Sequence, residues 1–330
     1  MVQDKPTSIP FDRRAFLACS GAAVLAAATV DPVRAAAAMR RTQVPGFYRF
    51  MLGDFEITVL SDGSYEIPTS LTGTNVPPEE VRAFLANNFD STETRTSHVN
   101  IPLINTGREL VLVDVGGGTS WRATAGKLVE NMAASGYKPD DVDKVVITHG
   151  HPDHIWGLLD ELDDSPRFRN ATYVITAAEW DFWTTDLAAE KMKPAFASFV
   201  SGAKKQLSPL AEKTTRIKAG AEVAPGIVTI DTPGHTAGHI SLAVSSKGQT
   251  LLISADVITS PHVSLQNPHW WPGTDLDPAQ GEASRRKFLG QASADKALVL
   301  AYHISFPGLG YVAPAGTAWR WVPATWTWKP

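Results

Sequence analysis

Cysteine is almost absent from this sequence. The 330 residues contain one, Cys19, which lies in an N-terminal segment unlike the rest of the chain. The chain after that segment therefore has no disulfide, no thiolate nucleophile and no cysteine that could ligate a metal. Any metal bound there must be held by imidazole and carboxylate groups, because these are the strong ligands that remain.

Blocks of basic residues are also missing. Lys and Arg number 30 against 34 Asp and Glu, which gives a net charge of −4 at pH 7. A chain without a basic patch is poorly suited to nucleic acid, so we expect neither a nucleic-acid partner nor nuclease activity. The hydrophobic content of 43% and the charged content of 19% are ordinary for a soluble globular protein.

The N-terminal segment has the organisation of an export signal. The pair Arg13-Arg14 precedes the apolar run Ala18–Val30, and alanines occupy positions 35–38. A charged start, an apolar run and a small-residue cleavage site are typical of such signals, and the paired arginines resemble the twin-arginine type. We predict that residues 1–38 are removed by cleavage near 35–38 and that residues 39–330 form a periplasmic protein. No stable membrane anchor is expected, because the apolar run is short and rich in alanine.

The remaining chain alternates between short apolar runs and helix-like stretches. The runs predicted as strands are 56–60, 110–113, 145–148, 172–175, 227–230, 240–244, 251–254 and 297–301. The stretches predicted as helices are 78–87, 121–135, 178–184, 194–205 and 279–292. This alternation indicates an α/β fold with buried sheets. Segments 62–98, 184–216 and 258–275 are expected as surface loops near a site.

The most informative motif is the run His149-Gly150-His151-Pro152-Asp153-His154. It follows the predicted strand 145–148, and His149 and His151 lie two residues apart, so in extended chain both point to one side. Asp153 and His154 are adjacent and must diverge unless the chain turns. A strand that turned into a helix here would give one pair of ligands to each of two metal ions. The alternative is that these are surface polar residues after a strand.

Further metal-ligating residue types occur where other predicted strands end. His235 follows 227–230, Asp256 follows 251–254, and His303 follows 297–301. In α/β folds the sites lie at the carboxyl ends of strands. Together with the motif these residues make seven candidate ligands, and a two-metal site with a shared water needs about six or seven. His239 is expected to be structural, and Asp114 to orient a ligating histidine through a hydrogen bond.

With this ligand set the chain resembles the metallo-β-lactamase-fold hydrolases. The resemblance implies a four-layer αββα sandwich with a binuclear site at one edge, and it excludes subclasses with a cysteine ligand. It implies that the first metal is bound by His149, His151 and His235, the second by Asp153, His154 and His303, and that Asp256 bridges them. Pro45–Arg49, Leu52–Thr58 and His303–Gly310 resemble the methyl parathion hydrolase group, whose relatives include lactonases and aryl-esterases.

The same resemblance suggests a substrate pocket. Trp121 and Trp183 match two positions of the aromatic cluster that lines the leaving-group pocket in that group, and Phe196 approximately matches a third. The loop 259–274 departs from the group, because it carries His262, His269, Trp270 and Trp271. Exposed aromatic residues in a Pro-rich loop often form a pocket wall. We therefore place six residues in the predicted pocket: Trp121, Trp183, Phe196, His262, Trp270 and Trp271.

The predicted reaction is hydrolysis by a metal-bridging hydroxide. Two divalent ions, Zn first and Mn, Fe or Co as alternatives, would lower the pKa of a shared water. Asp153 and Asp256 are the predicted catalytic residues, with Asp256 orienting the hydroxide. No general acid remains once the ligands are assigned, so aryl esters, lactones and organophosphate triesters with small apolar or aromatic groups are the expected substrates. Trp residues in 319–328 are candidates for a homodimer interface.

Several other functions fit the same ligand set. An acyl-homoserine lactonase, active in quorum quenching, is the nearest alternative. A β-lactamase or a thioesterase of the glyoxalase II type comes next, followed by a persulfide dioxygenase with a single iron. A noncatalytic binding protein is disfavoured because the ligand set is complete. Turnover of nitrocefin or of a glutathione thioester, and one iron per chain instead of two metals, would distinguish these alternatives.

Overall fold

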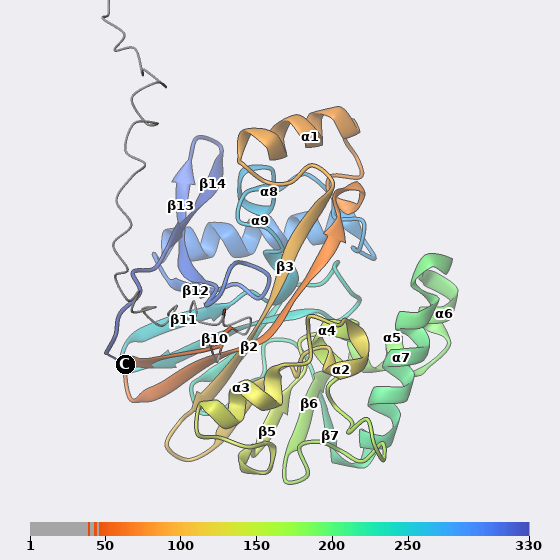
Figure 1. Ribbon diagram of the computed structural model, residues 1–330, viewed down its shortest axis with the longest axis vertical. Coiled ribbons are helices and arrows are strands. Elements are labelled where there is room, and N and C mark those ends of the chain that lie inside the picture. The colour runs from red at the N-terminus through yellow and green to blue at the C-terminus, as the bar shows by residue number, and fades with distance from the viewer. Residues whose placement is uncertain (1–38, 40–42, 45, 330) are drawn as a thin grey trace, which may run out of the picture. The chain divides into compact units, whose positions relative to one another are not determined.

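Two seven-stranded sheets form the centre of the fold (Figure 1). The computed structural model describes residues 39, 43–44 and 46–329, so the predicted export signal lies outside the described residues. The first sheet contains, in spatial order, β1 (Phe47–Leu52), β2 (Phe55–Pro68), β3 (Thr94–Asn105), β4 (Leu110–Val113), β5 (Lys144–Val146), β6 (Thr172–Thr176) and β7 (Thr214–Ile217). The second contains β14 (Ala318–Pro323), β13 (Leu309–Ala315), β12 (Leu298–Leu300), β11 (Gln249–Ile253), β10 (Ile240–Ser246), β9 (Ile227–Asp231) and β8 (Glu222–Ala224).

Helices cover the outer face of each sheet. The helices are α1 (Pro78–Asn87), α2 (Gly118–Trp121), α3 (Leu128–Ala134), α4 (Pro152–Ile155), α5 (Ala177–Thr184), α6 (Leu187–Lys191), α7 (Ala197–Leu207), α8 (Val263–Gln266) and α9 (Pro278–Ala294). In Figure 1, α3 and α5–α7 lie beside the first sheet, and α9 lies beside the second. The αββα sandwich implied by the resemblance is confirmed.

Most of the buried apolar side chains occupy three layers. Leu128, Met132 and Leu207 pack from the helices onto the first sheet. A second cluster, which includes Ile57 and Leu242, lies between the two sheets. Phe288, Leu289 and Ala292 of α9 pack on the outer face of the second sheet. Burial of these apolar faces is the main favourable term that holds the layers together.

The strand directions bring the candidate ligands to one edge. β4, β5, β6 and β7 are parallel neighbours, so the loops after Val113 and Val146 leave the first sheet on the same side. β11 and β12 are parallel, and β9 runs in the same direction because two antiparallel pairings through β10 connect it to β11. The loops that carry His235, Asp256 and His303 therefore also leave their sheet on a common side.

Two sequence predictions are wrong in detail. Segment 62–98 was expected as a loop. Instead, β2 extends to Pro68 and β3 begins at Thr94, so both ends of this segment belong to two long strands that pair in antiparallel fashion. The helix predicted over 121–135 is divided into α2 and α3. Gly126 interrupts it with a positive φ of 77°. Among the residues that the structure describes, no helix is long and apolar enough to cross a membrane.

The break between α2 and α3 depends on the buried side chain of Asp62 in β2. Its carboxylate accepts hydrogen bonds from the backbone N–H groups of Gly117 (2.9 Å), Gly126 (3.1 Å) and Leu128 (2.8 Å). The last of these is a donor at the start of α3 that has no partner inside the helix. Asp62 thus holds the loop that carries Trp121 toward the candidate site.

We expect Asp62 to make the stability of the protein depend on pH. Burial raises its pKa from 3.8 to about 6, against the effect of its N–H donors. A carboxyl group with a raised pKa in the folded state binds its proton more tightly there, so its contribution to the free energy of unfolding falls as pH rises from about 4 to about 6. The expected loss is on the order of 3 kcal/mol.

The Asp62→Asn variant isolates this contribution, because asparagine cannot lose the proton. Denaturant unfolding of the metal-free wild type and variant should be measured from pH 4 to pH 7. The wild-type free energy of unfolding minus that of the variant should decrease across this range. Parallel pH profiles for the two proteins would contradict the prediction.

Candidate metal centre

The histidine-rich motif forms a turn between β5 and α4. His149 and His151 lie in the extended segment after β5, and Pro152 begins α4, so Asp153 and His154 lie in its first turn. The structure places the motif's ligands in two groups, one that contains His149 and His151 and one that contains Asp153 and His154. The predicted division of the motif into two pairs therefore corresponds to the observed geometry.

The first group is completed from the second sheet by His235 and Asp256. The Nδ1 atom of His151 lies 3.1 Å from Nε2 of His149 and 2.9 Å from Nε2 of His235. Nε2 of His235 lies 3.1 Å from Oδ2 of Asp256. A tetrahedral ion with ligand bonds of about 2.0–2.1 Å separates its ligand atoms by roughly 3.3 Å, so this spacing suits one small cation.

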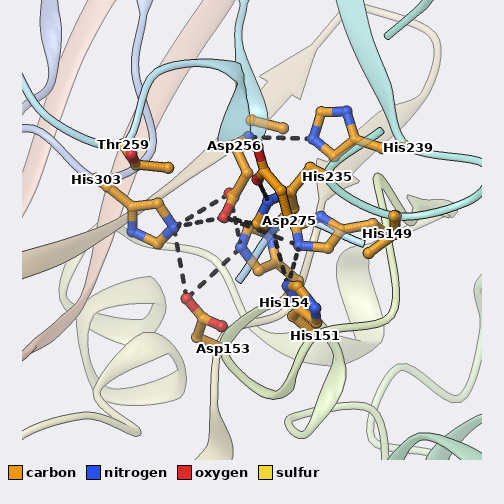
Figure 2. Close-up of polar contacts among 12 residues, drawn as sticks. His149, His151, Asp153, His154, His235, His239, Asp256, Thr259, Asp275 and His303 are labelled. Carbon is orange, nitrogen blue, oxygen red and sulfur yellow. Dashed lines mark hydrogen bonds and ion pairs between the residues drawn. The ribbon is translucent and has the colours of Figure 1, made fainter. Parts of the chain in front are cut away.

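The second group consists of Asp153, His154 and His303. Oδ2 of Asp153 lies 3.6 Å from the Nε2 atoms of both histidines. These Nε2 atoms each lie 3.1 Å from Oδ1 of Asp256. Asp256 therefore turns one carboxylate oxygen toward each group, and Figure 2 shows it between them.

Hydrogen bonds from outside fix the orientation of the ligands. Nδ1 of His154 donates to Asp114 at 2.8 Å, which is the hydrogen bond expected of this aspartate, and Nδ1 of His235 donates to Asp275 at 2.7 Å. His303 donates through Nδ1 to the backbone carbonyl of His98 at 2.8 Å. Each bond fixes the orientation of the ring and directs Nε2 at the centre. Burial works to lower the pKa of His154 and of His235, but Asp256 outweighs it and holds the first well above its usual value and the second at about 9, so both rings would release a proton when a metal binds.

His239 lies beside the centre and belongs to neither group. Its Nδ1 donates to the carbonyl oxygen of Thr232 at 3.0 Å, and its Nε2 accepts from the backbone N–H of Asp256 at 3.2 Å. Burial lowers its pKa to about 3, so it is neutral. His239 holds the Asp256 backbone in place, as its predicted structural role requires.

The electrostatics of the centre suit cation binding. Burial lowers the pKa of His149 and of His151 well below the usual value, so these rings are neutral and their lone pairs are free. Burial works to raise the pKa of Asp256, but the surrounding histidines outweigh it and hold this pKa well below its usual range. Oδ1 of Asp256 and Nε2 of His154 are buried and lie 3.1 Å apart as an ion pair, but neither makes a well-aligned hydrogen bond to a described residue. Converging, buried and unsatisfied atoms of this kind fit divalent metal ions.

A cavity of about 140 Å³ opens onto the centre. The groups at its base are His151, Asp153, His235, Asp256 and His303. Its walls include the apolar residues Ile67, Leu71, Trp121, Phe196 and Phe199 and the polar residues Tyr65, Arg95, Arg122 and Thr259. Two of the six predicted pocket residues, Trp121 and Phe196, therefore line the cavity beside the candidate ligands.

Trp183 lies beneath the cavity and not in its lining. Its side chain is completely buried, and its Nε1 donates to Glu179. Gly150 rests on the indole ring, where a Cβ atom would lie only 2.4 Å away. The tryptophan thus supports the turn between His149 and His151, and glycine is needed there because the ring approaches the backbone so closely.

The three predicted pocket residues of the 259–274 loop also lie outside this cavity. Trp270 is only 3% exposed and packs edge-on against Phe84 at 5.2 Å. Trp271 donates through Nε1 to Glu282 of α9 at 3.1 Å. His262 pairs with Asp90 at 2.8 Å and lines a separate cavity of about 570 Å³. The loop still contributes to the pocket wall, but through Thr259, Pro272 and Thr274.

Comparison with known proteins agrees with the fold. The family model described as "Metallo-beta-lactamase superfamily" matches residues 94–303, which contain all seven candidate ligands. The chain belongs to this superfamily. A curated relative, the N-acyl homoserine lactonase of a Bacillus species, is 26% identical over 162 residues, which are 49% of this chain and 56% of the relative. This chain matches only about half the length of the curated relatives.

Solved structures extend the likeness over nearly the whole described chain. A structure of AidC, a dizinc quorum-quenching lactonase in complex with a product, has a TM-score of 0.79 at 26% identity and covers 86% of this chain and 98% of its own. The hydrolase AbOPH has a TM-score of 0.80 at 29% identity and covers 87% of this chain and 100% of its own. The superfamily and these neighbours support a metal-dependent hydrolase with divalent metals at the His and Asp groups.

Proposed function

We propose that the protein hydrolyses small aryl esters and lactones at a two-metal centre, with organophosphate triesters as related substrates. The observation that carries the proposal is Asp256, whose two oxygens face the two ligand groups at the base of a cavity with apolar walls. Divalent metals held there, Zn in the first place, would polarise the scissile carbonyl or phosphoryl group and supply an activated water.

The residues of the chain have distinct roles in this proposal. One metal would be held by His149, His151 and His235. The other would be held by Asp153, His154 and His303, and Asp256 would contact both. Asp114 and Asp275 keep the rings of His154 and His235 in the binding orientation. The indole of Trp121 and the ring of Phe199, which meet edge-on at 5.5 Å, offer an apolar surface to the substrate.

The cavity favours substrates that need little help from an acid. Among its described lining residues, the hydroxyl of Tyr65 already donates to Asp153 at 2.6 Å, and Glu66 is exposed to solvent. An aryloxide is a good leaving group, and the alkoxide of a lactone stays attached to the product. Both kinds of ester therefore suit this arrangement better than a simple alkyl ester.

An acyl-homoserine lactonase is the second candidate. It is supported by the lactonases among the relatives and by the product named for AidC, N-hexanoyl-L-homoserine. The cavity is small beside the roughly 300–1,000 Å³ of pockets for drug-sized ligands. A long acyl chain would have to extend out of it, so compact lactones are the first expectation.

Metal removal and a substrate panel test the proposal. The protein is stripped with a chelator, checked by elemental analysis, and reloaded separately with Zn, Mn, Co or Fe. Phenyl acetate, dihydrocoumarin, N-hexanoyl-homoserine lactone, methyl parathion, nitrocefin and a glutathione thioester are then compared. We expect loss of more than about 100-fold in the stripped protein and recovery on reloading, with dihydrocoumarin or phenyl acetate turned over fastest. Full activity in the stripped protein would overturn the proposal.

A further inference from the structure

Arg95, near the start of β3, is a charged side chain in the wall of the substrate cavity. It lines this cavity together with Asp256 and His303. It also lines a second, more polar cavity of about 260 Å³ that contains Asp90 and His98. The guanidinium therefore stands between the metal-binding residues and a polar space on the other side.

The charge of Arg95 is only partly satisfied by the protein. One terminal N–H of the guanidinium donates to the backbone carbonyl of Thr259, and the Nε atom is buried with no hydrogen-bond partner. Arg95 forms no ion pair with any described residue. By contrast, Arg167 and Arg285 each pair with carboxylates. Burial lowers the pKa of Arg95, as expected when a cation is removed from water. Arg95 is half-buried, and a cation that is partly removed from water without a carboxylate partner is costly, so a ligand often completes such a group.

Asp256, Asp90 and Glu66 lie near enough to favour the charged form of Arg95, but among the described residues none of them forms an ion pair with it, and Asp90 pairs with His262 instead. Glu66 lines the same two cavities, but it is exposed and its carboxylate accepts a hydrogen bond from Thr96 at 2.7 Å. Arg122 adds a second positive charge to the cavity wall, where its guanidinium carbon lies 4.6 Å from the ring centroid of Trp121. Solvent strongly screens the field of an exposed carboxylate such as that of Glu66.

We propose that Arg95 selects substrates that carry a carboxylate in addition to the ester or lactone bond that is cleaved. Guanidinium groups bind carboxylates through strong, charge-assisted hydrogen bonds. The carboxylate would lie at the Arg95 side of the cavity while the scissile carbonyl lies over the His and Asp groups. This inference rests on the proposed esterase function and narrows its substrate class.

Two esters of equal chain length test the inference. Mono-4-nitrophenyl glutarate carries a terminal carboxylate, and 4-nitrophenyl valerate ends in a methyl group. The kcat/KM ratio of the glutarate ester to the valerate ester should fall about 10–100-fold in Arg95→Met, the loss expected for a hydrogen bond between charged groups. Arg95→Lys should retain part of the ratio because it keeps the charge. Arg122→Met removes a positive charge at the rim of the same cavity, where the side chain is exposed and solvent screens its field, so this control should change the ratio by less than about threefold.

Binding of the free acids provides a readout independent of turnover. Calorimetry with the metal-loaded protein should show that Arg95→Met weakens glutarate binding about 10-fold or more and leaves valerate binding unchanged. If valerate binding weakens equally, Arg95 holds the carboxylate formed by hydrolysis, and the selection proposed here is overturned. An unchanged ester ratio in Arg95→Met, with normal metal content and circular dichroism, would also overturn it. If the wild type hydrolyses neither ester with metal bound, the proposed esterase function itself fails.

Discussion

Replacing Asp256 with alanine should abolish hydrolysis and release metal from both ligand groups. Its Oδ2 atom lies 3.1 Å from Nε2 of His235, and its Oδ1 atom lies 3.1 Å from Nε2 of both His154 and His303. No other described side chain contacts both groups in this way. The loss of a shared ligand removes several kcal/mol of stabilisation, so we expect kcat/KM to fall at least about a thousandfold.

Elemental analysis after dialysis should find well under one metal per chain in Asp256→Ala, and fewer metals than the wild type in Asp256→Asn. Asp256→Asn retains the volume and one oxygen, so it separates the loss of charge from the loss of packing. Asp231→Ala, which removes an exposed carboxylate at the end of β9, is the control and should keep both metals. Two metals bound to Asp256→Ala with the wild-type affinity would show that Asp256 is not a shared ligand.

The sequence predicted best those features that depend on residues close together in the chain. The six-residue motif contains four of the clustered side chains, and the other three follow strands whose directions bring them to the same edge. Strand β4 and helix α1 begin and end at the predicted residues because an apolar run and Pro78 define them clearly. These features depend on neighbours in sequence, which is why pattern and spacing suffice to predict them.

The residues that surround the centre depend on distant partners and could not be predicted in this way. Arg95 and Tyr65 lie in long strands that extend into a segment read as a loop. Asp275 lies in a loop, and only the fold brings it to His235, 40 positions away. Trp270 shows the opposite error, since an apparently exposed aromatic residue is buried against α1. A sequence pattern indicates which face of a helix or strand is buried. It does not indicate which other element packs against that face.

Glu179 is a second residue that the sequence did not single out, and its replacement should have a large effect. It lies in α5, where a charged residue suggests a solvent-exposed position, but it is completely buried. One carboxylate oxygen accepts from the backbone N–H of Gly150 at 2.8 Å and from Trp183. The other accepts from Thr236 at 2.8 Å and from the backbone N–H of Gly238 at 2.7 Å.

Three of these four bonds connect the two loops that carry the histidines of the first ligand group, and the fourth comes from Trp183 of the same helix. Gly150 lies between His149 and His151, and Thr236 follows His235. Glutamine at position 179 has one oxygen and one NH2 group, so two of the four donors would face a donor and remain buried without a partner. Each such loss costs about 1–3 kcal/mol. The expected consequence is that the loop carrying His149 and His151 shifts relative to the loop carrying His235.

The first ligand group should therefore lose affinity while the second is retained. We expect Glu179→Gln to bind metal at the first group about 100-fold or more weakly than the wild type, because outer hydrogen bonds alone commonly account for 10–100-fold in metal affinity. Titration with a graded series of chelators, followed by elemental analysis, should resolve a weakly and a tightly held metal. Glu282→Gln removes a carboxylate of α9 that binds Trp271 and Arg286 away from the centre, and it should leave both affinities unchanged.

Comparison of the metal-free proteins separates positioning from general stability. If Glu179 only stabilised the fold, Glu179→Gln would lower the unfolding temperature of the metal-free protein and weaken both groups to the same degree. If it positions the two loops, the affinity of the first group falls by a larger factor than that of the second. The second group has its own hydrogen bonds, which join Asp153 to Tyr65, His154 to Asp114 and His303 to His98. Glu179 takes part in none of these three bonds. This independence is the reason to expect one retained metal per chain in the variant.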